Sequence, residues 1–454
     1  MNLVYKKLRY YYWLLKAFFK KNLRSIIVSC VGSFFLIFLI VNFYPYLSAL
    51  ILRKHDVIGI VGTYKLQNPP SEILNLISNP LINVNDKGQI VPLLINKYEI
   101  SKDQKIYRFH LKPNLYWSNK TRFTARDIRL DLKGTEMKVI DDLTIEFHLD
   151  QPLSIFPIYL TKPLIKYPLI GIAGLYDRQS YKSNRGTIKE ITLVPNKKDF
   201  ATITYKMYTN EDVLGTAYKK GEIRLFKTNK KTIADSFNSF NNTIISKTVD
   251  YTQIITLFFN TEAGMLEDKD VRKALVEAIP NNKVFGQIAS GPIPPTSWAF
   301  YSSIKQYPFD PEKSRTVIEK NATASAPAQL SISTFYDYID LGEDIKKSLE
   351  NIGVKVTLKV LSYIPPDFEM LLSSWSPPTD PDQYFYWHST QAVLENRNIT
   401  HLKSLKVDNY LEKGRAQLGV AGRKAVYQQF QKAIMDEVPA HFMYYPYEYT
   451  IERK

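Results

Sequence analysis

With 454 residues, the chain is longer than one hydrophobic core usually organises, which is roughly 250–300 residues, and it therefore predicts two lobes. Hydrophobic residues make up 45% and charged residues 23%, ordinary globular usage that excludes wholesale disorder. The net charge of +16 does not mark a nucleic-acid-binding protein, because residues 1–54 carry nine basic residues and no acidic one, and the remainder, with 51 basic against 44 acidic residues (+7), holds no concentrated basic motif.

The first predicted element is a transmembrane helix. Residues 25–44 contain no charge, and a helix of that length, at about 1.5 Å per residue, covers a ~30 Å hydrocarbon layer. We assign residues 25–52 to the helix and residues 1–24 to a basic cytoplasmic segment, because basic residues stay on the cytoplasmic side. Pro45, flanked by two tyrosines, fits the outer interface, where such helices end. The chain is thus expected in the cell membrane, single-pass, with its C-terminal portion extracytoplasmic.

Two other interpretations of this segment are a cleaved signal peptide and a lipoprotein signal. The apolar run exceeds the roughly 7–15-residue core of a signal peptide, and no clean small-x-small cleavage site follows it. Residues 27–30, IVSC, have the form of a lipidation box, but only two residues separate them from Arg24, so no apolar core precedes the cysteine. We therefore predict that Cys30 is a membrane-helix residue. As the only cysteine, it excludes an intrachain disulfide.

The first lobe is predicted over residues 56–255 and is rich in strands. A strand followed by a helix opens it, as in a mixed sheet with helical cover. Alternating runs and hairpin turns then indicate a β-rich subdomain at about residues 64–170. The segments behind this prediction are strands at 57–62, 107–111 and 144–149, helices at 71–78 and 210–220, and a turn at 85–88.

The pattern changes near residue 256 to helices followed by strands. Residues 256–440 are therefore predicted as a second, α/β lobe, and residues 441–454 as a return to the first lobe. The segments concerned are helices at 268–279, 342–352 and 423–437 and a strand at 354–360. The fold class is α/β, a mixed α+β arrangement. Because the chain stops soon after Tyr449, shortened closing strands are expected.

Short sequence blocks occur in a fixed order across the outer portion. Trp117-Ser118 leads to a turn at Asn119-Lys120 and then to a helix start at residues 124–127. Further blocks lie at 259–261, 270–275, 291–295, 309–313, 349–356, 375–382 and 423–439. Together, over most of residues 57–450, they resemble the bacterial extracellular solute-binding proteins of family 5, the oligopeptide- and dipeptide-binding group that serves ABC transporters. The turn departs from the family signature, which has Asp-Gly where this chain has Asn-Lys.

The resemblance implies a two-lobed fold of the periplasmic-binding-protein type II (cluster C) kind. It also implies a monomeric receptor that captures an oligopeptide or another small solute between its lobes and delivers it to the permease of an ABC transporter, without a cofactor. The residues themselves indicate no catalysis, since Gly-x-Ser-x-Gly, His-Glu-x-x-His and phosphate-loop motifs are missing. The nearest of the scattered histidines, His388 and His401, predict no metal site.

Residues 375–388 are the most informative stretch, because a loop locked by prolines and dense in aromatics and carboxylates can preorganise a ligand wall. By resemblance this stretch lines the cleft. In peptide-binding relatives an aspartate three residues after the tryptophan pairs with the ligand's α-ammonium group, but here that position is Pro378. Asp380 or Asp382 is the candidate that replaces this ammonium-binding aspartate. The competing interpretation of Asp380 is that its side chain caps a turn. The predicted ligand-binding residues are Trp375, Asp380, Asp382, Tyr384, Trp387, Tyr64 and Trp298.

Two further hypotheses belong to other functional classes. An anchored sensor or interaction protein would keep the fold with a degenerate or non-peptide cleft. A hydrolase or metal carrier would need a nucleophile and base, or converging histidines, within reach of one another. For Trp375 and Trp387, packing in the core competes with stacking on a ligand. Relative to the family, the few residues between Asp127 and the strand pair at 138–149 also predict a smaller first-lobe subdomain.

Overall fold

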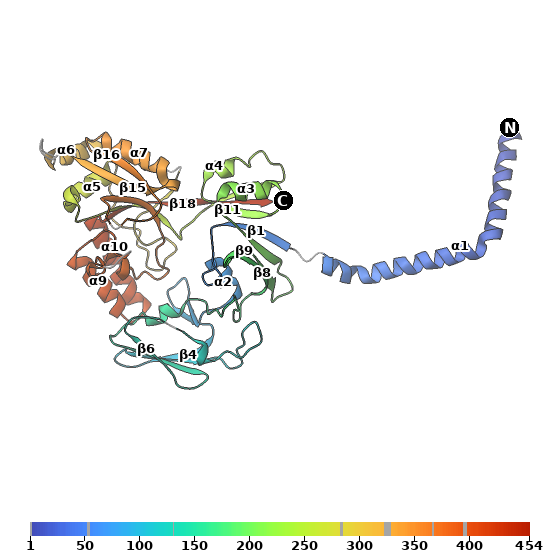
Figure 1. Cartoon of the computed structure of the whole chain (residues 1–454), viewed down its shortest axis with the longest axis horizontal. Helices are drawn as coiled ribbons and strands as arrows, with labels where there is room; N and C mark the ends of the chain where they lie inside the picture. The colour runs from blue at the N-terminus through green and yellow to red at the C-terminus, as the bar shows by residue number, and fades with distance from the viewer. Residues whose placement is uncertain are drawn as a thin grey trace.

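The computed structural model describes residues 2–51, 55–129, 131–281, 285–321, 328–365, 367–393 and 397–454. A long helix, α1, leads into a body with two lobes (Figure 1). One sheet of 12 strands runs through both lobes, in the order β16-β15-β17-β13-β18-β11-β1-β10-β9-β8, with β12 and β14 also paired to β18. The sheet is therefore shared, while the helices that cover it belong to one lobe or the other.

Helix α1 (Asn2–Ile51) is continuous over 50 residues. It includes the helix predicted at residues 25–52 as far as Ile51, and it passes through Pro45 at the loss of one backbone hydrogen bond. Within it, Arg9–Leu39 is long and apolar enough to cross a membrane, with a mean hydropathy of 1.9 and none of it buried; a signal sequence has the same properties. The side chain of Cys30 and those around Pro45 lie outside the described part of the chain.

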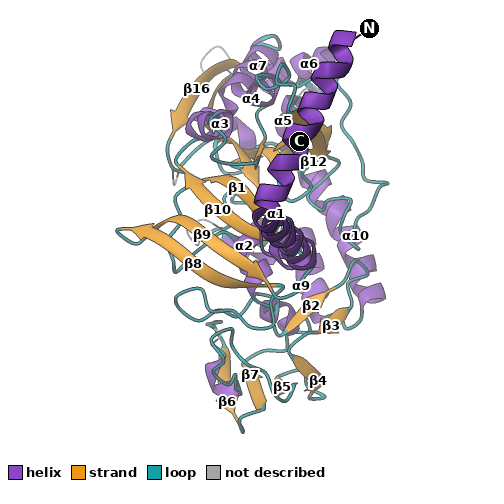
Figure 2. Ribbon diagram, turned by 90° about the vertical axis from the view of Figure 1, so that its right-hand side faces the viewer, coloured by secondary structure: helices purple, strands orange, loops and turns teal. Residues whose placement is uncertain are grey.

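Lobe 1 is built on a mixed sheet. Its strands are β1 (His55–Val61), β8 (Tyr176–Asn184), β9 (Thr187–Pro195), β10 (Thr202–Tyr208), β11 (Leu225–Thr228) and β12 (Thr243–Val249), and its helices are α2 (Ser71–Ile77), α3 (Glu211–Lys219) and α4 (Lys231–Asp235). Strand β1 runs parallel to both β10 and β11, while β8, β9 and β10 are antiparallel neighbours (Figure 2). The strand predicted at 57–62 corresponds to β1, and the helix predicted at 210–220 corresponds to α3, which the Asn210 side chain caps.

The β-rich subdomain carries its own core. It contains the hairpin β2 (Ile82–Val84) and β3 (Ile90–Pro92) and the antiparallel sheet β4 (Ile95–Ile100), β5 (Ile106–Leu111), β7 (Thr144–Leu149) and β6 (Thr135–Val139). Phe147 and Phe156 pack with ring centroids 5.1 Å apart in this core. Trp117 packs on Phe123 at 5.3 Å, and Lys120 takes the left-handed φ of 68° at the position where the family signature has glycine.

Lobe 2 packs helices on both faces of its part of the sheet. Its strands are β13 (Ile254–Phe259), β14 (Gly286–Ile288), β15 (Gln329–Phe335), β16 (Lys355–Leu361) and β17 (Met370–Trp375), and its helices are α5 (Lys269–Glu277), α6 (Pro311–Asn321), α7 (Ile339–Glu350), α8 (Tyr384–Trp387), α9 (Leu405–Ala416) and α10 (Val420–Glu437). Strand β13 is buried on both sides: Leu257 faces one core cluster and Phe258 the other. This explains why its sequence, IITLFF, is apolar except for the buried Thr256.

Strand β18 (Ala440–Arg453) joins the lobes. Its first part pairs with β13 and β14 of lobe 2, and its second part pairs with β11 and β12 of lobe 1. Strand β18 has 14 residues, and the expectation that the closing strands are shorter than those of the family stays a prediction. The predicted return to lobe 1 at residue 441 is too early, because Tyr444 still pairs with Ile255 of lobe 2, whereas Tyr447 pairs with Val249 of lobe 1.

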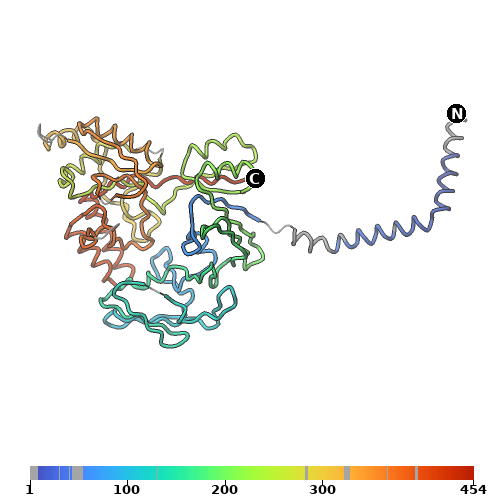
Figure 3. The backbone as a smooth tube through the Cα atoms, in the orientation of Figure 1, coloured from blue at the N-terminus to red at the C-terminus, as the bar shows by residue number. Residues whose placement is uncertain are grey.

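The lobes have separate apolar cores. Two core clusters draw only on lobe 2, two on the main part of lobe 1, and one on the subdomain. Besides β18, residues 250–253 connect the lobes, and the Asp250 carboxylate holds them in a turn by accepting hydrogen bonds from the Thr252 amide (2.9 Å) and the Gln253 side chain (2.6 Å). The tube in Figure 3 follows both connections between the lobes.

Candidate functional site

Asp380 lies in the proline-rich loop that follows β17 and is buried, with 6% of its surface exposed. The Arg423 guanidinium, at the start of α10, donates to both of its oxygens, at 3.0 Å from Nη1 to Oδ2 and 2.5 Å from Nη2 to Oδ1. Asp380 Oδ1 also accepts from the Asp382 amide at 3.0 Å. The predicted turn cap is thus present, and the carboxylate is in addition fully engaged in an ion pair inside lobe 2.

Aromatic rings surround Arg423. Its guanidinium carbon lies 5.2 Å from the centre of the Trp298 ring and 5.4 Å from that of Tyr427. Burial lowers the pKa of Arg423 and Asp380 raises it, and the balance lies above the ordinary pKa of arginine. Asp380 therefore holds Arg423 charged in an aromatic setting, as expected of a structural ion pair.

Asp382 makes a second ion pair in the same loop. Arg415, near the end of α9, donates from Nε (3.0 Å) and Nη2 (2.9 Å) to Asp382 Oδ2. The same guanidinium lies over the Tyr384 ring, 3.8 Å from its centre, and over the Phe385 ring at 4.9 Å. Burial lowers the pKa of Arg415, but Asp382 raises it above the ordinary value. Neither aspartate of the loop is unpaired in this structure.

Arg415 also lies where lobe 2 meets the β-rich subdomain. The Ser154 amide donates to the Arg415 carbonyl at 3.1 Å, and the Ser154 hydroxyl contacts the carbonyls of Arg415 and Gln417, the latter at 3.0 Å. Arg415 Nη2 is 3.5 Å from the Tyr159 hydroxyl. We call Ser154, Tyr159, Arg415 and Gln417 the clasp. It is polar, made of few bonds, and remote from β18 along the chain.

The two predicted loop tryptophans lie in the core of lobe 2. Trp387 is 1% exposed and donates to Gln383 Oε1 at 2.8 Å, and Trp375 is 9% exposed, with its ring 5.8 Å from that of Trp387. Phe442 of β18 contacts both rings. This arrangement is the core packing that competed with ligand stacking, and a direct ligand contact by either ring stays a prediction.

The other three predicted aromatics are only partly buried. Tyr64, in lobe 1, donates to the Val61 carbonyl at 3.1 Å. Trp298, in lobe 2, lies against the subdomain, because a β-carbon built on Gly88 would be 2.7 Å from its ring. The ring of Tyr384 stacks on His388 with centroids 4.1 Å apart. Thus five of the predicted residues gather in one region of lobe 2 with Trp298 beside them, while no contact among the described residues joins Tyr64 to that group.

Sequence reasoning missed the residues that partner the candidate carboxylates. Arg415 belongs to no motif, Arg423 only opens the block at 423–439, and Ser154 and Tyr159 are about 260 positions away from their partners in the chain. One available signal was charge balance: two carboxylates in a loop of prolines and aromatics require cationic partners if the loop is buried. Which arginines supply them depends on the packing of α9 against α10.

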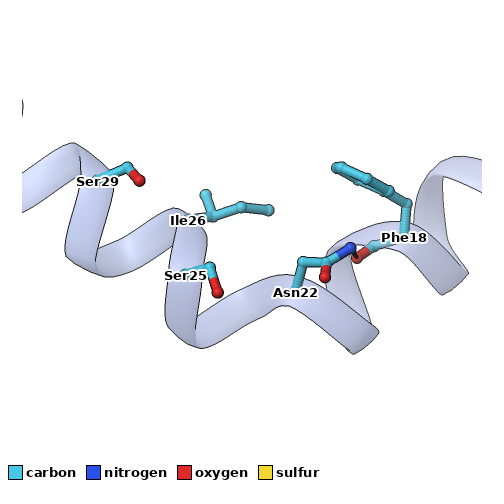
Figure 4. Close-up of a pocket in the computed structure, with 5 residues that line it drawn as sticks. All are labelled: Phe18, Asn22, Ser25, Ile26 and Ser29. Atoms are coloured by element: carbon cyan, nitrogen blue, oxygen red, sulfur yellow. Dashed lines mark hydrogen bonds between the residues drawn. The ribbon is translucent and has the colours of Figure 1, made fainter.

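The described residues contain no group of three or more His, Cys, Asp or Glu side chains that could hold a metal ion. One pocket lies outside the lobes altogether, on α1, where Phe18, Asn22, Ser25, Ile26 and Ser29 line it (Figure 4). The loop region of lobe 2 brings together aromatic rings and paired charges.

Comparison with known proteins agrees with this architecture. The family of bacterial extracellular solute-binding proteins, family 5 (middle region), matches residues 89–134 and 129–393. The oligopeptide-binding protein AppA of Bacillus subtilis (strain 168) is 23% identical over 283 residues, 54% of this chain and 50% of that protein, so the alignment spans half the relative's length. The probable D,D-dipeptide-binding periplasmic protein DdpA of Escherichia coli (strain K12) is 22% identical over 409 residues, 77% of this chain and 78% of that protein.

Solved structures show the same fold at low identity. NikZ from Campylobacter jejuni in complex with Ni(L-His) superposes with a TM-score of 0.72 at 19% identity, covering 88% of this chain and 94% of that one. AppA from Bacillus subtilis in complex with a nonapeptide gives a TM-score of 0.69 at 17% identity, with coverage of 88% and 94%. The family match spans more than half of the chain, and the chain therefore belongs to the bacterial extracellular solute-binding proteins of family 5, which are binding proteins and not enzymes.

Proposed function

We propose that this protein is a membrane-anchored receptor that captures peptides between its two lobes outside the cell and delivers them to an ABC transporter. The observation that carries the proposal is the separation of the apolar cores; among the described residues the lobes are joined by β18, the turn at residues 250–253, polar contacts and the approach of Trp298 to the subdomain. Such lobes can rotate about their connection without breaking either core. Closure on a ligand is then a shift between two arrangements, driven by contacts that the ligand makes only with the closed one.

The proposed contact surface includes Trp298 and Tyr64. Both are partly buried, they come from different lobes, and Trp298 faces the subdomain across the lobe boundary. Trp375, Trp387 and Tyr384 would support this surface from behind. Main-chain hydrogen bonds and aromatic faces suit a peptide of variable sequence, because they do not depend on particular side chains of the ligand.

The charges of the loop lead to a specific expectation for the ligand's N-terminus. Asp380 is paired with Arg423 and Asp382 with Arg415, so a ligand ammonium group would have to share a carboxylate with an arginine. We propose that Asp380 and Asp382 act through their arginines in shaping the wall. Peptides with free and acetylated N-termini should then bind with similar affinity, whereas an unpaired aspartate would favour the free ammonium strongly.

The membrane anchor is part of the proposal and rests on α1. Its exposed apolar side chains, such as Phe34, Phe35 and Phe38, need a nonaqueous environment. Intact mass measurement of the protein extracted from membranes separates an anchor from a cleaved signal. Retention of residues 1–54 supports the anchor, and a mature protein that begins after the apolar run excludes it.

The binding proposal is tested with the full-length protein in detergent. Native mass spectrometry should detect a co-purified solute, and calorimetric titration should show binding of short peptides, acetylated or not. Trp298→Ala should weaken binding about tenfold, or about 1.4 kcal/mol, while Tyr336→Ala, at a ring that is 78% exposed on lobe 2, should not. Failure to bind or retain any solute would refute the receptor function and favour the anchored sensor or interaction protein.

A further inference from the structure

The part of α1 that precedes the charge-free run has two different faces. Between residues 9 and 24 every side chain is exposed or only partly buried, and acidic residues are missing up to Asp56. At about 100° per residue, Arg9, Lys16, Lys20 and Arg24 fall within one sector of roughly 80°. Large apolar side chains occupy the opposite side, namely Tyr11, Leu15, Phe18 and Phe19. A helix with these faces is amphipathic and basic.

Helix α1 changes direction between this segment and the rest of the helix (Figures 1 and 3). A pocket formed by a single helix marks the concave side of such a bend, and its lining runs from Phe18 to Ser29 (Figure 4). The Asn22 side chain donates to the Phe18 carbonyl at 3.2 Å and so adds a bond to the backbone there. The bend therefore lies where the basic segment gives way to the charge-free run that begins at Ser25.

We propose that residues 9–24 form an interfacial helix that binds the anionic phospholipid headgroups of the cytoplasmic leaflet. The inference rests on the proposed anchor, because a helix that crosses the bilayer from Ser25 onward brings the preceding turn to the inner surface. The bend lets the basic segment lie along that surface, with its apolar face toward the acyl chains and its basic face toward the phosphates. Charge complementarity selects the occupant, since the segment has basic side chains and no acidic ones.

Trp13 provides a probe of this arrangement. It lies within the basic face, with Lys16 Nζ 5.3 Å from its ring centre, and it is the only tryptophan before Trp117. The other four tryptophans belong to the two-lobed body, so a quencher carried by lipid reports on Trp13. The full-length protein is reconstituted into vesicles of phosphatidylcholine, with or without phosphatidylglycerol, in which one lipid at a time has brominated acyl chains.

We expect brominated phosphatidylglycerol to quench Trp13 at least twofold more than the same fraction of brominated phosphatidylcholine, with the preference lost in high salt. The variant K16Q/K20Q/R24Q should lose it as well. The variant K102Q/K189Q/K198Q lowers the net charge equally at exposed sites of the body and should keep it. Equal quenching by both lipids in the wild type would overturn the proposal.

Flotation of the same vesicles separates this proposal from the anchor on which it rests. Protein that floats with both vesicle types but shows no lipid preference keeps the anchor and refutes the headgroup interaction. Protein that does not float at all refutes the anchor itself. Quenching of Trp13 that responds to native membrane proteins, and not to lipid composition, would assign the basic face to a protein partner and would also refute the proposal.

Discussion

Among the contacts that join the lobes, strand β18 and the clasp differ most in kind. Strand β18 is continuous, its register is fixed in both lobes, and residues such as Phe442 and Ile451 are buried in different cores. The clasp consists of a few hydrogen bonds from Ser154 and Tyr159 to α9 and the residue after it. Each such bond contributes only about 0.5–1.5 kcal/mol net.

The difference indicates where the molecule can move. A strand that is buried at both ends can bend but cannot separate from either lobe without unfolding it, whereas polar contacts at the clasp can exchange with water. The proline at position 446 adds to this, because it has no N–H and lies where β18 passes from one lobe to the other. Substitutions at β18 and in the lobe cores should therefore change stability, and substitutions at the clasp should change the opening of the lobes.

The largest effect on the free energy of unfolding is expected for Asp380→Ala, because this substitution breaks the ion pair inside lobe 2 and not a contact of the clasp. Loss of the carboxylate leaves Arg423 buried and unpaired, at a cost of about 4 kcal/mol in the free energy of unfolding. Urea denaturation measures it. Adding Arg423→Met should recover part of the loss, and Asp142→Ala, which breaks an exposed pair with Arg126, should cost less than about 1 kcal/mol. A small effect of Asp380→Ala would mean that Arg423 has another partner.

Ile451→Ala tests the anchoring of β18 in lobe 1. The side chain is fully buried three residues from the C-terminus, and its truncation should cost about 3 kcal/mol. Hydrogen exchange should show faster exchange in β11 and β12 with little change in β13 and β17. Ile244→Ala, on the neighbouring strand and 49% exposed, is the matched control and should cost less than about 1 kcal/mol. If amide hydrogen exchange became faster to the same extent in both lobes, the result would argue against separate apolar cores.

His441 predicts a pH dependence on the lobe 2 side of β18. Burial lowers the pKa of His441 to about 4, so the folded state keeps the ring neutral where the unfolded state, with a pKa near about 6.5, takes up a proton. The contribution of the neutral ring to the free energy of unfolding is fully present above the pKa of the histidine in the unfolded chain. It falls as the pH drops from about 6.5 toward about 4, by about 2 kcal/mol between pH 7 and pH 5. Urea denaturation at pH 7 and pH 5 measures this difference, and His441→Leu should remove it. If the variant keeps the same pH dependence, His441 is not its source.

The smallest effect on stability is expected at the clasp, with Ser154→Ala. The variant loses the hydroxyl contacts but keeps the amide bond to Arg415, so it should favour the open arrangement by about 1 kcal/mol, roughly fivefold in population. Distances between spin labels on the two lobes of the ligand-free protein report the opening. Ser183→Ala, at an exposed serine of β8, serves as the control. Identical distance distributions for both variants would show that the clasp does not hold the lobes.

The sequence predicted the elements whose signals are local. Strand β16 and helix α7 follow from the alternation and the apolar face that their own residues display, and the turn at Asn119-Lys120 follows from its position between Trp117 and the helix start at residues 124–127. The point at which β18 passes from lobe 2 to lobe 1 was not predicted, because no residue pattern within the strand marks it. Its partners in β13 and β12 lie about 180 to 210 residues earlier, so this point is set by tertiary pairing.

The candidate site was predicted less well for a related reason. The sequence places Asp380 and Trp375 in one loop, but the same aromatic and acidic residues serve equally as a ligand wall or as a core. Only the position of α10 decides that Arg423 neutralises Asp380, and only the packing of Phe442 decides that Trp375 and Trp387 face the core. Interactions across 40 to 70 residues leave no spacing that could be recognised.

The place of β18 after the other strands of both lobes also sets an order of events during synthesis. The lobe 1 strands β11 and β12 both pair with β18, which follows the whole of lobe 2 in the chain. A ribosome therefore delivers β18 only after lobe 2 has emerged, so the part of the shared sheet in either lobe stays incomplete until then. Such distant pairing slows folding, and the edges of β12 and β13 that pair with β18 stay open to chaperones until β18 has emerged.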